Sequence, residues 1–379
     1  MSDILFTVEE NTYGIPSDYA QRTSFSVKSC PRPYDVVWDT AEKPQDAIIQ
    51  VFNENPKNIL VVDRNVYDLY LKNEGLDASR IYFIDATEEH KTMQIVLDLA
   101  SFLETRRFTK GEKLIAVGGG ITEDIAAFIG AAYKRGIYWE LFPTTLLSMC
   151  DSCIGGKTGI NYNKAKNQMA LFSAPRRVVI NQNFLKTLHP REIKSGLGEI
   201  LKLSVTGGKA LVDRYASLVE NGKVKAFEYF RPLILGALWV KKAIVEDDEF
   251  ELNLRRSLNY GHTIGHAVEV LTNYAVPHGQ AVALGMIVVD KLSANRGLLD
   301  EQNRLYIKKL AQELLSADQT ACIHTQGLLD LIQKDKKTIG NKTNFVVMTD
   351  LGKTVFLPVE LSADVQKELT EIIEKEVKC

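Results

Sequence analysis

A glutamate, a lysine and three histidines have the types and spacings that metal-dependent chemistry requires. Glu199 and Lys202 stand three residues apart, so a helix would carry both on the same side. His262 and His266 stand four residues apart, and His278 follows at an expected junction between a loop and a helix. One carboxylate and two imidazoles suit a catalytic zinc or a similar divalent ion with positions left open for substrate. We therefore predict a metal site built from Glu199 and two of the histidines.

His262 and His266 could instead be a pair of ligands on successive turns of one helix, as in the HExxH zinc proteases. The residue after His262 is Thr263, so the catalytic glutamate of that motif is absent. Each histidine alone is more often structural than a ligand, and the prediction depends on their occurrence together.

The helix expected over residues 257–272 carries a polar stripe where a packing helix should be apolar. At 100° per residue, its His262 and His266 fall with the preceding Arg255 and Asn259 within an arc of about 60°. Solvated helix faces are usually rich in glutamate and lysine, and the two glycines in this segment would be poor choices on an exposed helix. We expect the stripe to line a cavity.

A glycine triplet, residues 118–120, lies between a strand-like run and a helical pattern. Glycines at such a turn let a phosphate approach the backbone, and the helix that follows offers free N–H groups and the positive end of its dipole. The spacing is not GxGxxG. Asp63 ends an earlier strand-like run, where carboxylates commonly bind ribose hydroxyls. Together these features favour a nucleotide site.

The segment 151–161 and the pair Lys166 and Asn167 are expected to form a loop rich in glycine, lysine and asparagine. It is not a P-loop, because the four-residue spacer between the glycines is missing. Lysines beside small residues, such as Lys157, still suit an approaching phosphate or carboxylate. The segment therefore indicates an anion site.

The elements that must position these residues change in character along the chain. Strand-like runs alternate with helical patterns in the first half, which predicts βαβ units and a mostly parallel sheet; the strands expected are 58–63, 113–117 and 138–142. Long helices dominate later, with a hairpin near the end and a final helix; these are expected at 226–246, 257–272 and 281–296, with hairpin strands at 344–348 and 354–357. We predict an α/β domain over 1–183 and a mainly helical domain over 184–379.

The composition is that of an ordinary soluble enzyme. The chain has 379 residues, 45% of them hydrophobic, and a formal net charge of −2, which gives no reason to expect a nucleic-acid or membrane partner. The acidic, polar start does not resemble a signal peptide, and no stretch of eighteen apolar residues suggests a membrane span. Five scattered cysteines fit a reducing compartment. We expect a cytoplasmic protein.

Taken together, the motifs resemble those of the sugar phosphate cyclases, and among them most those of the 3-dehydroquinate synthases. They follow the family's order between about residues 58 and 340. The matching segments are 118–124, 133–136, 143–147, 151–158, 166–167, 196–202, 258–266 and 278–279. The resemblance implies a Rossmann-like N-terminal domain, a helical C-terminal domain, bound NAD and one zinc or cobalt ion. We also expect a homodimer.

The resemblance also implies roles for individual residues. It makes Glu199, His262 and His278 the metal ligands. It assigns the nicotinamide dinucleotide to Asp63, Asn65, Glu88, Lys91, Gly119, Gly120, Asp124, Thr144, Thr145 and Lys166. It places the substrate and its chemistry among Arg135, Asp151, Lys157, Asn167, Lys202, Lys241, Arg255, Asn259 and His266. Lys336 or Lys337 would add a phosphate contact.

The activity that this resemblance implies is closure of a phosphorylated sugar acid into a carbocycle. The substrate would be 3-deoxy-D-arabino-heptulosonate 7-phosphate and the product 3-dehydroquinate, formed by transient oxidation, loss of phosphate, re-reduction and an intramolecular aldol step. The N-terminal stretch 23–38 looks more like relatives that cyclise sedoheptulose 7-phosphate. Those relatives usually lack an asparagine at the position of Asn259 and have proline in place of His266. The site decides substrate choice, so the sugar acid is favoured.

Two alternatives belong to other classes. A metal-dependent polyol or glycerol-phosphate dehydrogenase would share the two-domain plan and release NADH. The segments 151–157 and 261–266 favour the cyclase. A binding protein that has lost its activity should lack a ligand or a lysine, and here each is present.

Overall fold

The first twenty residues belong with the C-terminal part of the chain. The computed structural model describes residues 4–378 except 31, 164, 334–337 and 340–341. It divides into an α/β unit, Gln21–Leu188, and a second unit, Met1–Ala20 with His189–Cys379. These units differ from the expected domains 1–183 and 184–379, because strand β1 (Ile4–Val8) pairs in parallel with β16 (Lys353–Glu360).

The α/β unit is built on one mostly parallel sheet. Its spatial order is β3-β4-β11-β8-β7-β5-β6, and the pair β3 and β4 alone among these neighbours is antiparallel. The strands are β3 Ser24–Val27, β4 Tyr34–Trp38, β5 Ile59–Asp63, β6 Ile81–Ile84, β7 Lys113–Gly118, β8 Tyr138–Pro143 and β11 Arg177–Ile180. The continuous apolar runs of β5 and β7 are buried, as expected where both faces of a parallel sheet are covered. The predicted Rossmann-like fold class is confirmed.

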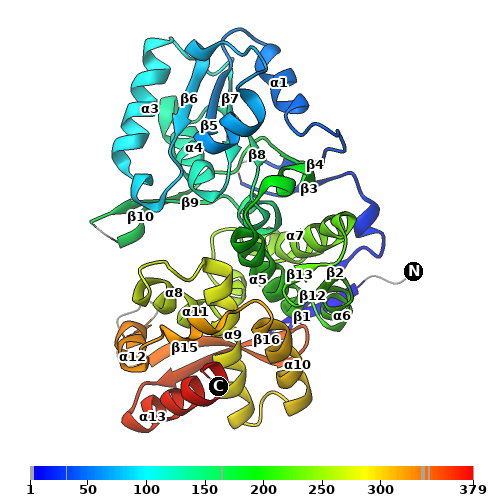
Figure 1. The fold of residues 1–379 in the computed structure, drawn as a ribbon, viewed down its shortest axis with the longest axis vertical. Helices are drawn as coiled ribbons and strands as arrows, with labels where there is room; N and C mark the ends of the chain where they lie inside the picture. The colour runs from blue at the N-terminus through cyan, green and yellow to red at the C-terminus, as the bar shows by residue number, and fades with distance from the viewer. Residues whose placement is uncertain (1–3, 31, 164, 334–337, 340–341, 379) are drawn as a thin grey trace. The chain divides into compact units, whose positions relative to one another are not determined.

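Helices cover this sheet, and a hairpin extends from it (Figure 1). Helix α4 lies against β7 and β8, α3 packs on α4, and α1 contacts β7. The helices are α1 Asp46–Asn53, α2 Arg64–Val66, α3 Met93–Thr105 and α4 Gly120–Ala132. The expected loop at 151–161 and 166–167 was wrong. Asp151 and Ser152 end a helical turn, Ser148–Ser152, and only residues 153–156 lie outside helix and strand. The remaining residues belong to an antiparallel pair, β9 (Lys157–Tyr162) and β10 (Ala165–Phe172).

The second unit is organised around two buried helices, α5 (Pro190–Thr206) and α9 (His278–Asn295), which pack on each other. A Cβ placed on Gly198 of α5 would collide with the carbonyl group of Gly279 of α9. The two backbones can therefore touch only because both positions are glycine. The other helices are α6 Lys209–Leu218, α7 Phe230–Asp247, α8 His262–Leu271, α10 Glu301–Gln312, α11 Ala317–Ala321, α12 Thr325–Gln333 and α13 Ala363–Ile372.

This unit also contains a five-stranded sheet. Its order is β14-β15-β16-β1-β2, with a separate short pair of β12 and β13. The further strands are β2 Asn11–Ile15, β12 Val219–Glu220, β13 Lys223–Val224, β14 Thr338–Ile339 and β15 Lys342–Asp350. The predicted hairpin is confirmed as β15 and β16. The strands that extend it were not foreseen, because β1 and β2 join it from the other end of the sequence.

The helix expected over 257–272 begins only at His262. Leu254–Asn259 form a 3-10 helix, and Gly261 between them has a φ of +75°. A Cβ on Gly261 would lie 2.7 Å from the carbonyl oxygen of Val282, so the turn requires glycine. The prediction of one helical stripe from Arg255 to His266 was therefore wrong.

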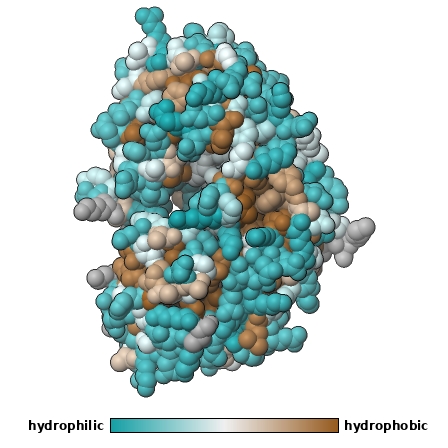
Figure 2. Space-filling view, in the orientation of Figure 1, coloured by the Kyte–Doolittle hydropathy of each residue, from teal (hydrophilic) through white to brown (hydrophobic). Residues whose placement is uncertain are grey.

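The surface drawn in Figure 2 is largely hydrophilic, with its hydrophobic residues in separate patches. Among the described residues, no helix combines the length and the apolar composition that crossing a bilayer requires.

A buried phenol and carboxylate join the turn before α8 to α9. The Tyr260 hydroxyl donates to Asp290 Oδ2 at 2.6 Å, and both residues are buried. Burial raises the pKa of Asp290 to about 7, although Tyr260 and Arg304 oppose the shift. The carboxyl therefore titrates near neutrality in the folded protein.

We predict that Asp290→Asn flattens the dependence of stability on pH. A carboxyl whose pKa rises from about 3.8 to about 7 on folding takes up a proton on folding, so it makes stability fall as pH rises through that window. The difference amounts to at most on the order of 4 kcal/mol. Thermal unfolding of the metal-free proteins between pH 4.5 and 7.5 measures it. Parallel curves for the two proteins would contradict the prediction.

Candidate functional site

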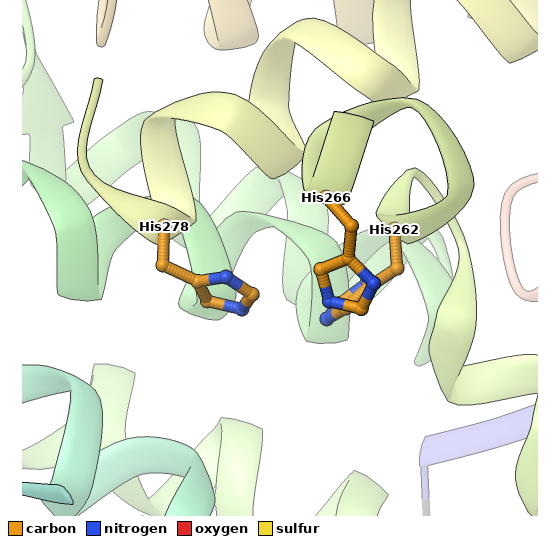
Figure 3. Close-up of side chains that lie close together, drawn as sticks. All are labelled: His262, His266 and His278. Atoms are coloured by element: carbon orange, nitrogen blue, oxygen red, sulfur yellow. The ribbon is translucent and has the colours of Figure 1, made fainter. Parts of the chain in front are cut away.

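Three imidazoles and one carboxylate meet in the second unit. The ring nitrogens of His262, His266 and His278 that face one another lie within 4.8 Å (Figure 3). Glu199 Oε1 is 3.6 Å from His262 Nε2 and 3.3 Å from His278 Nε2. The close approach at Gly198 and Gly279 explains this meeting, since those glycines are the chain neighbours of Glu199 and His278.

The carboxylate of Glu199 is held in its charged form. Burial alone would raise its pKa, but Lys202, with Nζ 2.6 Å from Oε2, and His278 hold the pKa well below its usual range. Both carboxylate oxygens are buried and receive no hydrogen bond of regular geometry from the described residues. A buried carboxylate beside imidazole nitrogens that can serve as ligands is a suitable place for a metal cation, whose charge would balance that of the carboxylate.

The second nitrogens of two histidines face acceptors. His262 Nδ1 lies 3.1 Å from the Tyr260 carbonyl oxygen, and His278 Nδ1 lies 2.9 Å from Glu269 Oε2. Such partners leave Nε2 of each ring toward Glu199, as in most metal-bound histidines. Burial alone would lower the pKa of His278, but Glu199 and Glu269 raise it to about 10. The residues fit a divalent ion held by Glu199, His262 and His278.

His266 gives the cluster a fourth member. It is more exposed than His262, and its ring lies 5.3 Å from that of His262 and 5.8 Å from that of His278. Geometry alone therefore allows a three-histidine set as well as the set with Glu199. The burial of Glu199 beside two Nε2 atoms favours the latter.

Cations are concentrated in the same unit. Lys202, Lys241 and Arg255 are each less than a tenth exposed. Arg255 lies in a turn that Asp248 stabilises by accepting hydrogen bonds from three backbone amides, including that of Arg255 at 3.0 Å. Asn259 donates to Glu251 Oε1 at 3.0 Å. Buried cations are costly in a structural core and typical of anion sites.

In the α/β unit, several of the predicted nucleotide residues lie at or just after the carboxyl ends of adjacent strands. Asp63 ends β5, Gly118 ends β7, and the Thr144 amide after β8 donates to the Gly118 carbonyl at 2.9 Å. The connection from β5 leads to β6 on one side, whereas that from β7 leads to β8 on the other. Parallel sheets bind ligands where the strand order reverses in this way.

The glycine turn is closely packed against the next strand end. A Cβ on Gly119 would lie 2.7 Å from the Thr145 methyl group. Gly120 begins α4, whose first amides stay available for a ligand. Asp63 accepts from the Asn65 amide at 2.8 Å, which starts the short helix α2.

A polar network ties the β9–β10 hairpin to this region. Lys91 forms an ion pair with Asp124 and donates to Asn167 Oδ1 at 2.7 Å. Asn161 donates to Glu88 Oε1 at 2.8 Å and accepts from the Asn167 amide at 3.0 Å. The structure thus joins residues predicted for the nucleotide to one predicted for the substrate. Lys166 adds a pair with Glu88 at 3.7 Å.

Three polar residues near these sites escaped the sequence analysis. Asn161 lies in the segment 151–161, but the sequence suggested no function for this residue. Glu123 is buried and accepts from the hydroxyls of Ser148 and Ser152, the ends of the turn that contains Asp151. Glu269 lies seven residues after His262, on the same side of the helix, and this spacing was an available signal.

Some predicted residues stand apart. Arg135 follows the carboxyl end of α4, about 20 Å of helix away from Gly120, and is exposed. Asn65 and Lys157 are also exposed, the latter at the start of β9. Lys336 and Lys337 lie outside the described residues.

Known proteins are similar in sequence to most of this chain. The family model for the N-terminal part of 3-dehydroquinate synthase matches residues 81–195, and that for the C-terminal part matches residues 196–338. A 3-dehydroquinate synthase from Thermoanaerobacter pseudethanolicus is 37% identical over 328 residues, covering 85% of this chain and 92% of that protein. One from Enterococcus faecalis is 36% identical over 311 residues, covering 79% of this chain and 86% of that protein.

Solved structures share the fold at lower identity. 2-Deoxy-scyllo-inosose synthase matches with a TM-score of 0.77 at 21% identity, covering 93% of this chain and 99% of that chain. A 2-epi-5-epi-valiolone synthase from Streptomyces hygroscopicus subsp. jinggangensis, with NAD+ and Zn2+ bound, gives 0.71 at 24%, covering 90% and 96%. An iron-containing alcohol dehydrogenase from Corynebacterium glutamicum gives 0.57 at 14%, covering 90% and 94%. At these identities the likeness shows the fold alone.

We predict that Glu269→Gln weakens divalent metal binding about 10- to 100-fold, because the amide cannot supply the charge that makes His278 a basic ligand. A Co2+ titration of metal-free protein measures the dissociation constant. Glu371→Gln is the matched control, since it removes a half-exposed carboxylate from α13. An unchanged constant in Glu269→Gln would show that this carboxylate has no part in the site.

Proposed function

Because the chain belongs to the 3-dehydroquinate synthase family, and is an enzyme of that cyclase type, we propose that it converts 3-deoxy-D-arabino-heptulosonate 7-phosphate into 3-dehydroquinate and phosphate. The observation that carries the proposal is the meeting of Glu199, His262 and His278 beside buried Lys202. A purely structural core would not concentrate these charges.

NAD and one divalent ion, zinc or cobalt, are the proposed cofactors. A related cyclase, 2-deoxy-scyllo-inosose synthase, has been solved with carbaglucose-6-phosphate, NAD+ and Co2+. In this chain Glu199, His262 and His278 would hold the ion. The nucleotide would contact Asp63, the glycine turn at Gly119 and Gly120, and the cluster around Lys91. NAD would supply a hydride acceptor and the ion a Lewis acid for a substrate oxygen.

The overall reaction fixes what becomes of the hydride. Substrate and product differ by phosphoric acid only, so the conversion involves no net oxidation. A hydride taken from the sugar must return to it within the same turnover. The protein therefore has to keep the intermediate bound, and several charged contacts serve that purpose.

The chain's own residues bind and orient the sugar in this proposal. Lys241 and Arg255 are buried cations suited to the carboxylate or phosphate, and Asn259 and His266 suit its hydroxyls. Glu251 fixes the Asn259 amide, and Asp248 fixes the turn of Arg255. Such prior orientation reduces the entropy lost when an open chain is held in a reactive shape. A cytoplasmic location and a homodimer stay predictions from the sequence.

We predict that NAD is required but not consumed. Purified protein with NAD, Co2+ and the sugar acid should form a ring product, identified by mass, while absorbance at 340 nm shows no stoichiometric NADH. His278→Ala should abolish turnover by removing a ligand while leaving the fold intact. One NADH per product would support the dehydrogenase alternative and reject the proposed cycle.

We predict that Lys241→Met lowers kcat/KM for the sugar acid about 10- to 100-fold, since a charge-assisted hydrogen bond contributes roughly 1.5–3 kcal/mol. Lys242→Met is the matched control, because the neighbouring lysine pairs with Glu246 at 2.7 Å. Equal effects of the two substitutions would remove Lys241 from the site.

The unmodified enzyme decides between the two sugars. Its kcat/KM should be clearly higher for 3-deoxy-D-arabino-heptulosonate 7-phosphate than for sedoheptulose 7-phosphate, which lacks the carboxylate. The opposite preference would replace the proposed substrate and leave the family assignment unchanged.

A further inference from the structure

Tyr260 connects the histidine cluster to a carboxylate buried in the core. Its carbonyl oxygen lies 3.1 Å from His262 Nδ1, and its hydroxyl donates to Asp290 at 2.6 Å. Tyr260 is 0% exposed and Asp290 is 1% exposed. One residue thus joins a candidate ligand to helix α9 by two hydrogen bonds.

The bond to the carbonyl determines which ring nitrogen of His262 carries hydrogen. A carbonyl oxygen only accepts, so Nδ1 must donate to it, and Nε2 of the neutral ring keeps its lone pair. Nε2 is the nitrogen that faces Glu199 Oε1. The position of the Tyr260 carbonyl therefore selects the tautomer that can bind a metal.

The backbone at this carbonyl lies outside regular secondary structure and is held by close packing. The Tyr260 amide donates to the Ser257 carbonyl at 3.2 Å, and a Cβ on Gly261 would lie 2.7 Å from the Val282 carbonyl oxygen of α9. Gly261 follows with a φ of +75°, and Tyr260 itself lies between a 3-10 helix and α8. The phenol bond to Asp290 adds a side-chain anchor to this backbone packing on α9. Asp290 belongs to the helix that begins with His278, about 18 Å further along its axis. The same rigid helix thus carries one candidate ligand and anchors the support of another.

We propose that Tyr260 and Asp290 are positioning residues of the metal site: their hydrogen bond fixes the carbonyl that orients His262. This inference rests on the metal site proposed above. It assigns both residues a role behind the ligands, without contact to substrate or ion.

The Tyr260–Asp290 pair is not explained by a contribution to stability alone. Asp290 Oδ1 is buried and has no hydrogen-bond partner among the described residues. Apolar side chains of similar size in both positions should leave the fold at least as stable, because a buried polar pair gains little over well-packed hydrophobic residues. Stability and positioning can therefore be separated by substitution.

The decisive variant is Tyr260→Phe combined with Asp290→Leu, compared with Asp290→Asn, which keeps an acceptor for the phenol. We expect the double variant to fold with a thermal midpoint close to that of the unmodified protein. Its Co2+ affinity should fall about 10- to 100-fold and its cobalt absorption spectrum should change, as when outer partners of ligands are removed. The Asp290→Asn variant, which keeps the acceptor, should bind Co2+ with an affinity within about threefold of that of the unmodified protein.

A measurement without metal tests the same step. In metal-free protein carrying 15N-labelled histidine, the ring-nitrogen shifts of His262 should show hydrogen on Nδ1, and the double variant should show a mixture of tautomers. Unchanged shifts and unchanged Co2+ affinity in the double variant would overturn the inference. Failure of the unmodified protein to bind Co2+ would instead reject the proposed metal site, and the ring-nitrogen shifts would then decide the role of the pair alone.

Discussion

The candidate metal site depends on direct contact between two helix backbones. Gly198 of α5 and Gly279 of α9 leave no room for a side chain, and their neighbours Glu199 and His278 consequently face each other. A larger residue at either position would separate the helices and the ligands together. The turn before α8 also depends on a glycine, because the backbone of Gly261 packs directly against α9 and so brings the next residue, His262, close to that helix. Glycine in this unit is thus a means of placing charged side chains at short distances inside a core.

The sequence predicted the chemistry of the site better than its geometry. Types and spacings were enough to predict a site of Glu199 and two histidines, because ligand chemistry restricts the choice of residues. The choice of His262 and His278 among the three came from the resemblance to the cyclases. Helical periodicity gave the wrong prediction at Arg255 and Asn259. Gly261, with its positive φ, interrupts the helix, but the spacing of polar residues in the sequence does not reveal the interruption. The β9–β10 hairpin was missed for a related reason: its glycines and lysines are typical of loops, and its pairing with the Asp124 region is a tertiary effect. The parallel sheet was predictable, because buried strands read as continuous apolar runs.

The two units would present different groups to an anion. The α/β unit has backbone amides at the strand ends and one network, centred on Lys91 and Asn161, whose polar groups pair with one another. The second unit instead buries Lys202, Lys241 and Arg255 whole. The first arrangement suits a nucleotide with a long diphosphate, which many weak donors can share. The second suits a small ligand, for which a few strong charges must decide orientation.

The parallel pairing of β1 with β16 has a consequence for biosynthesis. A ribosome makes β1 some 340 residues before β16, the strand that pairs with it in parallel. At synthesis rates of about 5–20 residues per second, the hairpin of β1 and β2 waits on the order of half a minute for β16. Gln21–Leu188, by contrast, is contiguous and can acquire its contacts while the rest is still being translated. The α/β unit is thus inserted between two segments of the second unit, and the second unit can complete its sheet only after β16 has been made.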